Sequence, residues 1–194
     1  MLLMEDHMNG ILIRSLMVLW FVFVMGSMAG TSASAAGDGQ PTFKVGDRLP
    51  DAGLIGSGSK SVRLTDTRGR VRLISIVPQL NTPVCDEQTH HFSEQNGGVD
   101  RTVEIVTIST NASADQAAFA KKAGISNVTF LSDSPSYEFG KRSGPLLPSY
   151  KILHRSVIVS DADNIIRYMQ LVPMGELPNF DAAFEAARRI ADKK

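Results

Sequence analysis

The stretch VRLISIVPQLNTPVC, residues 71–85, joins a buried strand to the start of a helix. Its first half consists mostly of β-branched and large apolar side chains, which is typical of a strand in the centre of a sheet. Pro78 ends this strand, because proline has no backbone N–H to donate to a neighbouring strand. Thr82 suits a helix N-cap and Pro83 suits the first helical position. We therefore expect a helix that runs from Pro83 to about Glu94.

The same alternation of strand and helix continues through the first half of the chain and predicts parallel strands with crossover helices. The second half changes to an antiparallel hairpin and a final amphipathic helix. This order predicts an α/β protein with a thioredoxin-like fold: a central mixed β-sheet flanked by helices, with an N-terminal β-hairpin. The other predicted elements are a hairpin over 54–58 and 61–65, strands at 103–109, 128–131, 156–159 and 165–172, and helices at 113–122, 137–142 and 180–191.

The first 35 residues have the features of a secretory signal peptide. Arg14 precedes an apolar run over residues 16–24, and small residues follow as far as Ala35. The run is shorter than the roughly 18 to 20 residues that cross a bilayer comfortably. We expect cleavage after Ala35 and export, to a bacterial periplasm. The alternative is an uncleaved tail that tethers the protein to a membrane.

The rest of the chain, about 160 residues, suits one domain with a sizeable core. We assign residues 36–42 to a flexible segment and residues 43–194 to that domain. Residues 1–35 hold one of the 20 basic and two of the 20 acidic residues, so the remaining net charge is about +1. This balance excludes the basic stripe of a nucleic-acid-binding protein and favours no stable membrane partner.

Cys85 is the single cysteine of the chain, which excludes a disulfide-stapled scaffold. In the first turn of the expected helix, unpaired backbone N–H groups and the helix dipole favour a thiolate. We interpret Cys85 as a nucleophile; the alternative is an inert buried cysteine.

No metal ion and no cofactor is expected. The histidines are scattered along the chain, and their spacing fits no zinc motif. The adjacent pair His90 and His91 points in two directions on a helix, and we expect it on a solvated helix surface.

The pattern formed by Pro78, Thr82 and Cys85 resembles the active-site loop of peroxiredoxins, and residues 81–89 with Phe92 are similar to the thiol peroxidase subfamily. Several further blocks follow in the family's order, so that the resemblance covers most of the chain after the leader. These blocks are residues 127–133, 138–140, 144–146, 154–159, 170–173 and 178–184.

The resemblance implies a thiol-dependent peroxidase that reduces hydrogen peroxide and organic hydroperoxides. Cys85 is then the attacking thiolate, which becomes a sulfenic acid, and the Thr82 hydroxyl hydrogen-bonds the peroxide. Pro78 closes the pocket, and Arg155 supplies a fixed positive charge beside the sulfur. The alternatives are that Thr82 only caps the helix and that Arg155 lies on the surface. Gln88 either reaches back toward the loop or faces solvent.

The chain departs from the subfamily pattern at Ala120, which occupies the position of the usual resolving cysteine. An internal disulfide is therefore excluded, and we favour an external thiol, either a thioredoxin-like protein or a small thiol. The other routes are a disulfide between the Cys85 residues of two chains and overoxidation. The resemblance also implies a homodimer. The alternative function is a redox sensor or binding protein of thioredoxin fold that does not turn over.

Overall fold

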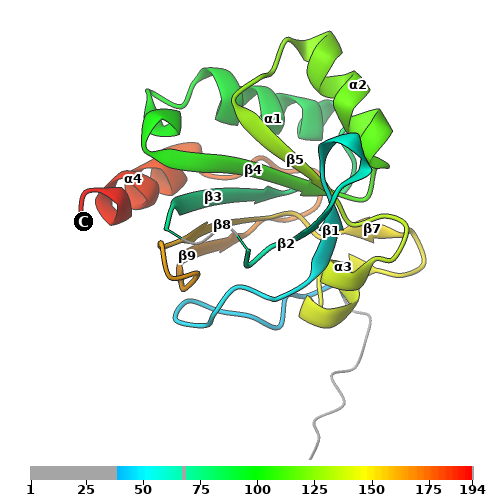
Figure 1. Ribbon diagram of the computed structural model, residues 1–194, viewed down its shortest axis with the longest axis horizontal. Helices are drawn as coiled ribbons and strands as arrows, with labels where there is room; N and C mark the ends of the chain where they lie inside the picture. The colour runs from blue at the N-terminus through cyan, green and yellow to red at the C-terminus, as the bar shows by residue number, and fades with distance from the viewer. Residues whose placement is uncertain (1–38, 67–68, 194) are drawn as a thin grey trace, which may run out of the picture. The chain divides into compact units, whose positions relative to one another are not determined.

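A mixed sheet of seven strands, in the order β2-β1-β5-β4-β3-β8-β9, organises the described residues (Figure 1). The structure, a computed structural model, describes residues 39–66 and 69–193. The predicted signal peptide and residues 36–38 lie outside this range. Within it, none of the helices combines the length and apolarity needed to span a bilayer.

The elements follow the predicted order closely. The strands are β1 (Gly53–Ile55), β2 (Ser61–Arg63), β3 (Val71–Ile76), β4 (Val103–Ser109), β5 (Val128–Ser132), β6 (Leu146–Leu147), β7 (Ile152–Leu153), β8 (Ser156–Ser160) and β9 (Ile166–Leu171). The α-helices are α1 (Pro83–Glu94), α2 (Ser113–Ala123), α3 (Glu138–Ser143) and α4 (Phe180–Ala191), with short 3₁₀ turns η1 (Ser57–Ser59) and η2 (Val99–Arg101).

The centre of the sheet is parallel, as the alternation of strand and helix predicts. β3 pairs with β4 from Val71 opposite Val103 to Ile76 opposite Ile108. β4 in turn pairs in parallel with β5. All residues of β3 are buried, because helices and loops cover both faces of the sheet at this point. The mixed sheet and flanking helices confirm the predicted fold class.

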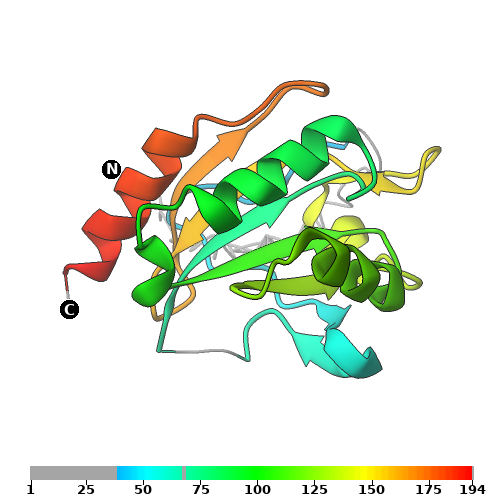
Figure 2. The ribbon, with the colours of Figure 1, turned by 90° about the horizontal axis from the view of Figure 1, so that it is seen from above.

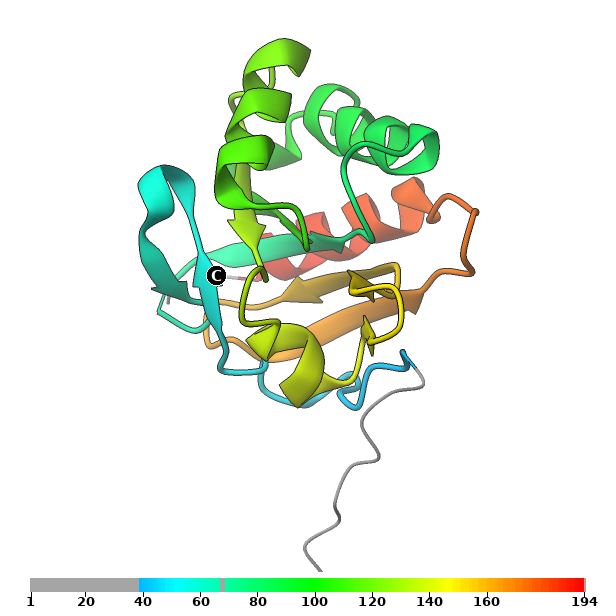
Figure 3. The same ribbon diagram turned by 90° about the vertical axis from the view of Figure 1, so that its right-hand side faces the viewer.

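Helices α1 and α4 cover one face of the sheet, whereas α3 lies on the other (Figures 1 and 3). Phe92 of α1 and Phe184 of α4 pack edge to face with ring centroids 5.5 Å apart. On the opposite face, Phe139 of α3 packs against Phe43 at 6.5 Å. Burying a phenylalanine of this kind contributes roughly 2 to 3 kcal/mol, so these contacts fix the helices against the sheet.

Both predicted hairpins form. β1 and β2 pair antiparallel, and Ile55 of β1 also pairs with Ser132, which joins this hairpin to the edge of β5. β8 and β9 pair antiparallel around a turn in which the Asp161 side chain accepts from the N–H groups of Asp163 and Ile165, both at 2.9 Å. Aspartate favours turns because its side chain can accept hydrogen bonds from the backbone of the turn, and this preference made the turn predictable from the sequence.

The small sheet of β6 and β7 is a difference from the prediction. Each strand has two residues, with Leu146 opposite Leu153 and Leu147 opposite Ile152. Strands of this length are too short to show an alternating pattern in the sequence. The turn between them lies at the same end of the large sheet as the loop that enters α1 (Figure 2).

Candidate active site

Cys85 lies in the first turn of α1, as predicted. The helix follows Thr82, whose extended backbone places it at the N-cap, and begins at Pro83. Cys85 is fully buried and packs in an apolar cluster with Val77 and Leu80. The sulfur is therefore shielded from water while it stays close to the unpaired N–H groups of the helix start.

Arg155 reaches the sulfur from the residue just before β8. Its Nη2 donates to Cys85 Sγ at 3.1 Å, although the two residues are 70 positions apart in sequence. The side chain is 2 % exposed, so it is not a surface arginine. A unit charge at about 4 Å contributes about 4 kcal/mol at an effective dielectric constant near 20, which favours a negatively charged sulfur.

Gln88 completes the cluster behind the sulfur and is fully buried. Its Oε1 accepts from Arg155 Nη1, and its Nε2 donates to Ser75 Oγ at 2.7 Å. The sequence left the direction of Gln88 open, and the structure places it inside the protein. Its spacing from Cys85, one helical turn, is the signal that indicates a shared helix face.

Thr82 and Pro78 belong to the loop before α1. Thr82 is half-buried, and its side chain makes no capping hydrogen bond to the helix; its Oγ1 lies 3.5 Å from the Gln79 carbonyl. Its hydrogen bond to the Gln79 carbonyl is long, so the hydroxyl can exchange it for another partner. Pro78 is buried, and its carbonyl accepts from Thr110 Oγ1 at 3.1 Å.

A second hydrogen bond holds the same loop, and the sequence did not predict it. The Leu80 N–H donates to Asn111 Oδ1 at 2.8 Å, so the segment between β4 and α2 supports the loop before α1. Nothing local in the sequence around Asn111 indicates this contact, because the two segments meet only through the pairing of β3 with β4.

The carboxylates after Cys85 lie toward solvent. Glu87 is exposed, and Asp86 approaches His90 Nε2 at 3.8 Å. His90 also contacts Glu94 at 2.7 Å, as a helix-surface residue would. His91 is half-buried and stacks on Phe180 of α4 with ring centroids 3.7 Å apart, so one face of its ring is covered rather than solvated. Phe180 and Phe184 of α4 supply the aromatic groups against which His91 packs.

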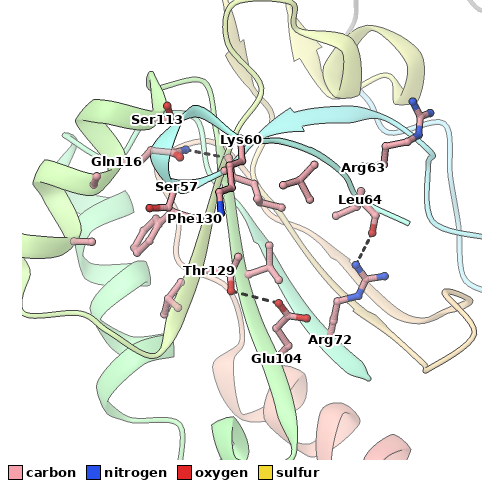
Figure 4. A pocket seen from close by; sticks show the side chains of 17 residues that line it. Ser57, Lys60, Arg63, Leu64, Arg72, Glu104, Ser113, Gln116, Thr129 and Phe130 are labelled. Atoms are coloured by element: carbon pink, nitrogen blue, oxygen red, sulfur yellow. Dashed lines mark hydrogen bonds between the residues drawn. The ribbon is translucent and has the colours of Figure 1, made fainter. Parts of the chain in front are cut away.

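Helix α2 separates two hollows. One, of about 750 Å³, lies beside the entrance of α1, where Thr82, Pro83 and Asp86 face Phe119 and Lys122 of α2. The other, of about 700 Å³, lies between α2, β4, β5 and the β1–β2 hairpin, and Ala120 lines it. Figure 4 shows this second groove, with Ser113 and Gln116 of α2 beside Lys60 of the loop between β1 and β2. Ala120, which the resemblance assigns to the position of the resolving cysteine, thus lines the groove away from the entrance of α1.

No group of three or more histidine, cysteine, aspartate or glutamate side chains within residues 39–66 and 69–193 is arranged to hold a metal ion. The chemistry on view is that of a thiol, a guanidinium and neutral hydrogen-bonding groups.

Comparison with known proteins gives one consistent result. The family described as Redoxin matches residues 44–184. The thiol peroxidase of Listeria innocua is 38 % identical over 147 residues, which cover 75 % of this chain and 88 % of that protein. A crystal structure of a peroxiredoxin-like protein from Aquifex aeolicus is 30 % identical and superposes with a TM-score of 0.68 over 78 % of this chain and 90 % of that one. The thiol peroxidase from Chromobacterium violaceum, 20 % identical, shares the fold with a TM-score of 0.67 over 82 % and 92 % of the two chains.

Proposed function

This chain belongs to the Redoxin family and, within it, to the thiol peroxidase subfamily of peroxiredoxins, and on that premise we propose that it is a thiol-dependent peroxidase of the one-cysteine type. Its substrates are hydrogen peroxide and organic hydroperoxides, and its role is antioxidant defence. The observation that carries the proposal is the contact of Arg155 Nη2 with Cys85 Sγ, 3.1 Å long and buried in the first turn of α1.

In the first step, the Cys85 thiolate attacks one oxygen of the peroxide and a sulfur–oxygen bond forms. The oxygen–oxygen bond breaks, and the second oxygen leaves as hydroxide or alkoxide and takes up a proton. Sulfur is oxidised to a sulfenic acid and the peroxide is reduced to water or an alcohol. Charge moves from sulfur to the leaving oxygen, so a fixed cation beside both atoms stabilises the transition state.

Three further groups serve this step. Arg155 holds the thiolate before the reaction and faces the developing charge during it. Thr82 has a hydroxyl that makes no bond to the helix, and it hydrogen-bonds the peroxide. Pro78, buried and tied to Thr110, closes the pocket and limits the access of water to the sulfur. A dry site strengthens each of these electrostatic interactions.

The second half of the cycle requires a thiol from outside the chain, because Cys85 is its only cysteine. An external thiol attacks the sulfenic acid, releases water and leaves a mixed disulfide on Cys85. A second thiol then releases Cys85 and forms the disulfide of the reductant. A direct bridge between two Cys85 residues is disfavoured, since each is fully buried and disulfide geometry requires the two sulfurs to come within about 2.05 Å.

Stopped-flow measurement of peroxide reaction tests the proposal. We expect the purified protein to react with hydrogen peroxide or an alkyl hydroperoxide far faster than a free thiol, and Cys85→Ser to lose that reaction. Equal rates for the two proteins would remove the peroxidase function. Fast oxidation of Cys85 without repeated turnover, in the presence of several candidate thiols, would instead favour a redox sensor. Mass spectrometry of Cys85 under these conditions identifies the reducing thiol.

A homodimer is part of the proposal. Three large apolar side chains are exposed at one end of the sheet: Tyr150 in the β6–β7 turn, and Leu171 and Met174 at and after the end of β9. Figure 2 places both segments at the end where the chain enters α1, and exposed apolar groups on segments near a site favour an interface there. Light scattering of the purified protein tests the dimer. A monomeric mass at micromolar concentration contradicts the dimer, and a dimer unaffected by Tyr150→Ser combined with Met174→Ser contradicts this interface.

Export to the periplasm completes the proposal and rests on the sequence features of residues 1–35 alone. Determination of the amino terminus of the protein isolated from its native host tests it. A start near Ala36 supports cleavage, whereas an intact leader contradicts it.

A further inference from the structure

Ser75 lies on β3 behind the active site, and it is fully buried against α1. It accepts a hydrogen bond of 2.7 Å from Gln88 Nε2, while the Oε1 of the same amide accepts from Arg155. We propose that Ser75 is a positioning residue for the peroxide reaction: its hydroxyl oxygen occupies the donor end of the Gln88 amide and so keeps the carbonyl end on Arg155. This inference rests on the proposed peroxidase function.

The chemistry of the amide explains why the serine is needed. A guanidinium only donates, so Arg155 requires the carbonyl end of Gln88. The NH₂ end then points into the core, where leaving a donor without a hydrogen-bond partner is unfavourable. Ser75 Oγ is the acceptor that Nε2 has there. Without it, Gln88 turns to find another acceptor, and its hold on Arg155 weakens.

The orientation of the guanidinium depends on this hold. Arg155 Nη2 contacts the sulfur and Nη1 contacts Gln88, whereas its buried Nε has no hydrogen-bond partner within the described residues. A planar guanidinium with two of its three nitrogens engaged is fixed by those two contacts. If the contact with Gln88 loosens, the nitrogen that faces Cys85 Sγ moves as well.

A hydroxyl at this position is itself informative. Ser75 lies on the face of β3 that also bears Leu73, because side chains alternate along a strand. That face packs into an apolar cluster, and Leu73 is fully buried there. The strand partner of Ser75 on β8, Val157, is apolar, whereas its partner on β4, Thr107, is a buried hydroxyl. What sets Ser75 apart from Thr107 is its hydrogen bond to Gln88.

Thr107 supplies a matched comparison. It pairs with Ser75 across β3 and β4, and it is also fully buried. Its Oγ1, however, has no hydrogen-bond partner in the part of the chain that the structure describes. Removing this hydroxyl deletes a buried polar group of the same kind, on the adjacent strand, without touching Gln88.

The experiment compares Ser75→Thr with Ser75→Val, two side chains of nearly equal shape that differ by a hydroxyl. The readout is the rate constant for oxidation of Cys85 by hydrogen peroxide. We expect Ser75→Val to react about tenfold more slowly than Ser75→Thr, since a loss of about 1.4 kcal/mol corresponds to tenfold. Thr107→Val is expected to keep the wild-type rate. Circular dichroism confirms that each variant is folded, and Ser75→Ala replaces the pair if the larger side chains prevent folding.

A second background separates positioning from packing. Methionine at position 88 has neither an amide carbonyl nor an N–H, so a hydroxyl at position 75 has no amide to hold. In Gln88→Met, the Thr and Val variants at position 75 are therefore expected to react at rates within about twofold of each other. An equal tenfold difference in both backgrounds, or no difference with Gln88 present, overturns the inference. If the wild-type protein reacts no faster than a free thiol, the proposed function fails instead, before Ser75 is tested.

Discussion

The guanidinium of Arg155, 3.1 Å from Cys85 Sγ, is the group on which the proposed chemistry depends most. Arg155→Ala removes a buried cation that faces both the thiolate and the leaving oxygen. We expect the rate constant for peroxide oxidation to fall by about 100- to 1000-fold, as for the loss of one preorganised donor. Stopped-flow fluorescence or competition with a reference peroxidase measures this rate.

Arg155→Lys tests the same prediction with a smaller change to the side chain. Lysine keeps the charge but loses the fork that contacts Gln88 and Cys85 together, so an intermediate rate is expected. The control is Arg142→Ala, which removes an exposed arginine of α3 that pairs with Glu138. A wild-type rate in Arg155→Ala would remove this residue from the reaction.

Substitutions at Thr82 distinguish a catalytic role of its hydroxyl from a structural role. Its side chain makes no capping bond to α1, so Thr82→Val is expected to slow peroxide oxidation while the free energy of unfolding changes by less than about 1 kcal/mol. Thr82→Ser keeps the hydroxyl and should keep most of the rate. Urea unfolding and stopped-flow oxidation, measured on the same samples, check both parts. A large loss of stability with an unchanged rate would show that Thr82 acts only at the helix start.

Helix α2 decides whether a second cysteine can complete the cycle within the chain. Ala120 lines the groove beside the β1–β2 hairpin, whereas Phe119 and Lys122 face the hollow beside the entrance of α1. In Ala120→Cys, we therefore expect the disulfide with Cys85 to form more slowly than the sulfenic acid, because α2 has to unwind first. Quenched samples resolved by mass spectrometry measure both species.

The end of α2 supplies a companion variant. Gly124 ends the helix with φ +69, a conformation that costs an alanine about 1 kcal/mol. Gly124→Ala weakens this end and should speed disulfide formation in Ala120→Cys. If the disulfide forms as fast as the sulfenic acid in Ala120→Cys alone, α2 need not unwind.

The pH dependence of stability is a property of the whole molecule, and Asp133 dominates one part of it. Burial raises the pKa of Asp133 from 3.8 to about 6, although the N–H groups of Phe139 and Gly140 donate to its carboxylate and oppose the rise. Between pH 4 and 6 the folded protein therefore binds more protons at this site than the unfolded chain does. The contribution of Asp133 to folding stability is expected to fall as pH rises through this range, by about 2 to 3 kcal/mol, and to level above it.

Asp133→Asn cannot titrate and should lose this slope, whatever its effect on stability at one pH. Urea unfolding at several values between pH 4 and 7 measures the slope. Asp115→Asn, which changes an exposed carboxyl of α2, is the control and should keep it. A wild-type slope in Asp133→Asn would assign the titration to another group.

Much of the fold is visible in the sequence because local signals agree with it. Pro83 begins α1, and Gly124 ends α2 with its backbone N–H bonded to the preceding turn. The strands β6 and β7 cannot be predicted from the sequence, because two residues are too few to show a periodic pattern. The hydrogen bond between Leu80 and Asn111 cannot be predicted either, because it joins segments that are distant in the sequence. In the site, Cys85 and Thr82 are visible through the helix start. The direction of Gln88 and its bond to Ser75 are not.

The sequence by itself determined where the thiol lies, in the first turn of a helix that leaves a buried strand, and that no second thiol of the chain can reach it. The first feature depends on a few neighbouring residues, and the second depends on the number of cysteines in the chain. Only the tertiary structure decided what surrounds the sulfur. The antiparallel register of β3 and β8 places Ser156 opposite Ile76, which brings Arg155 to the end of β3 from which the chain leads to Cys85. A contact of this kind depends on strand pairing between distant segments, which no local propensity specifies.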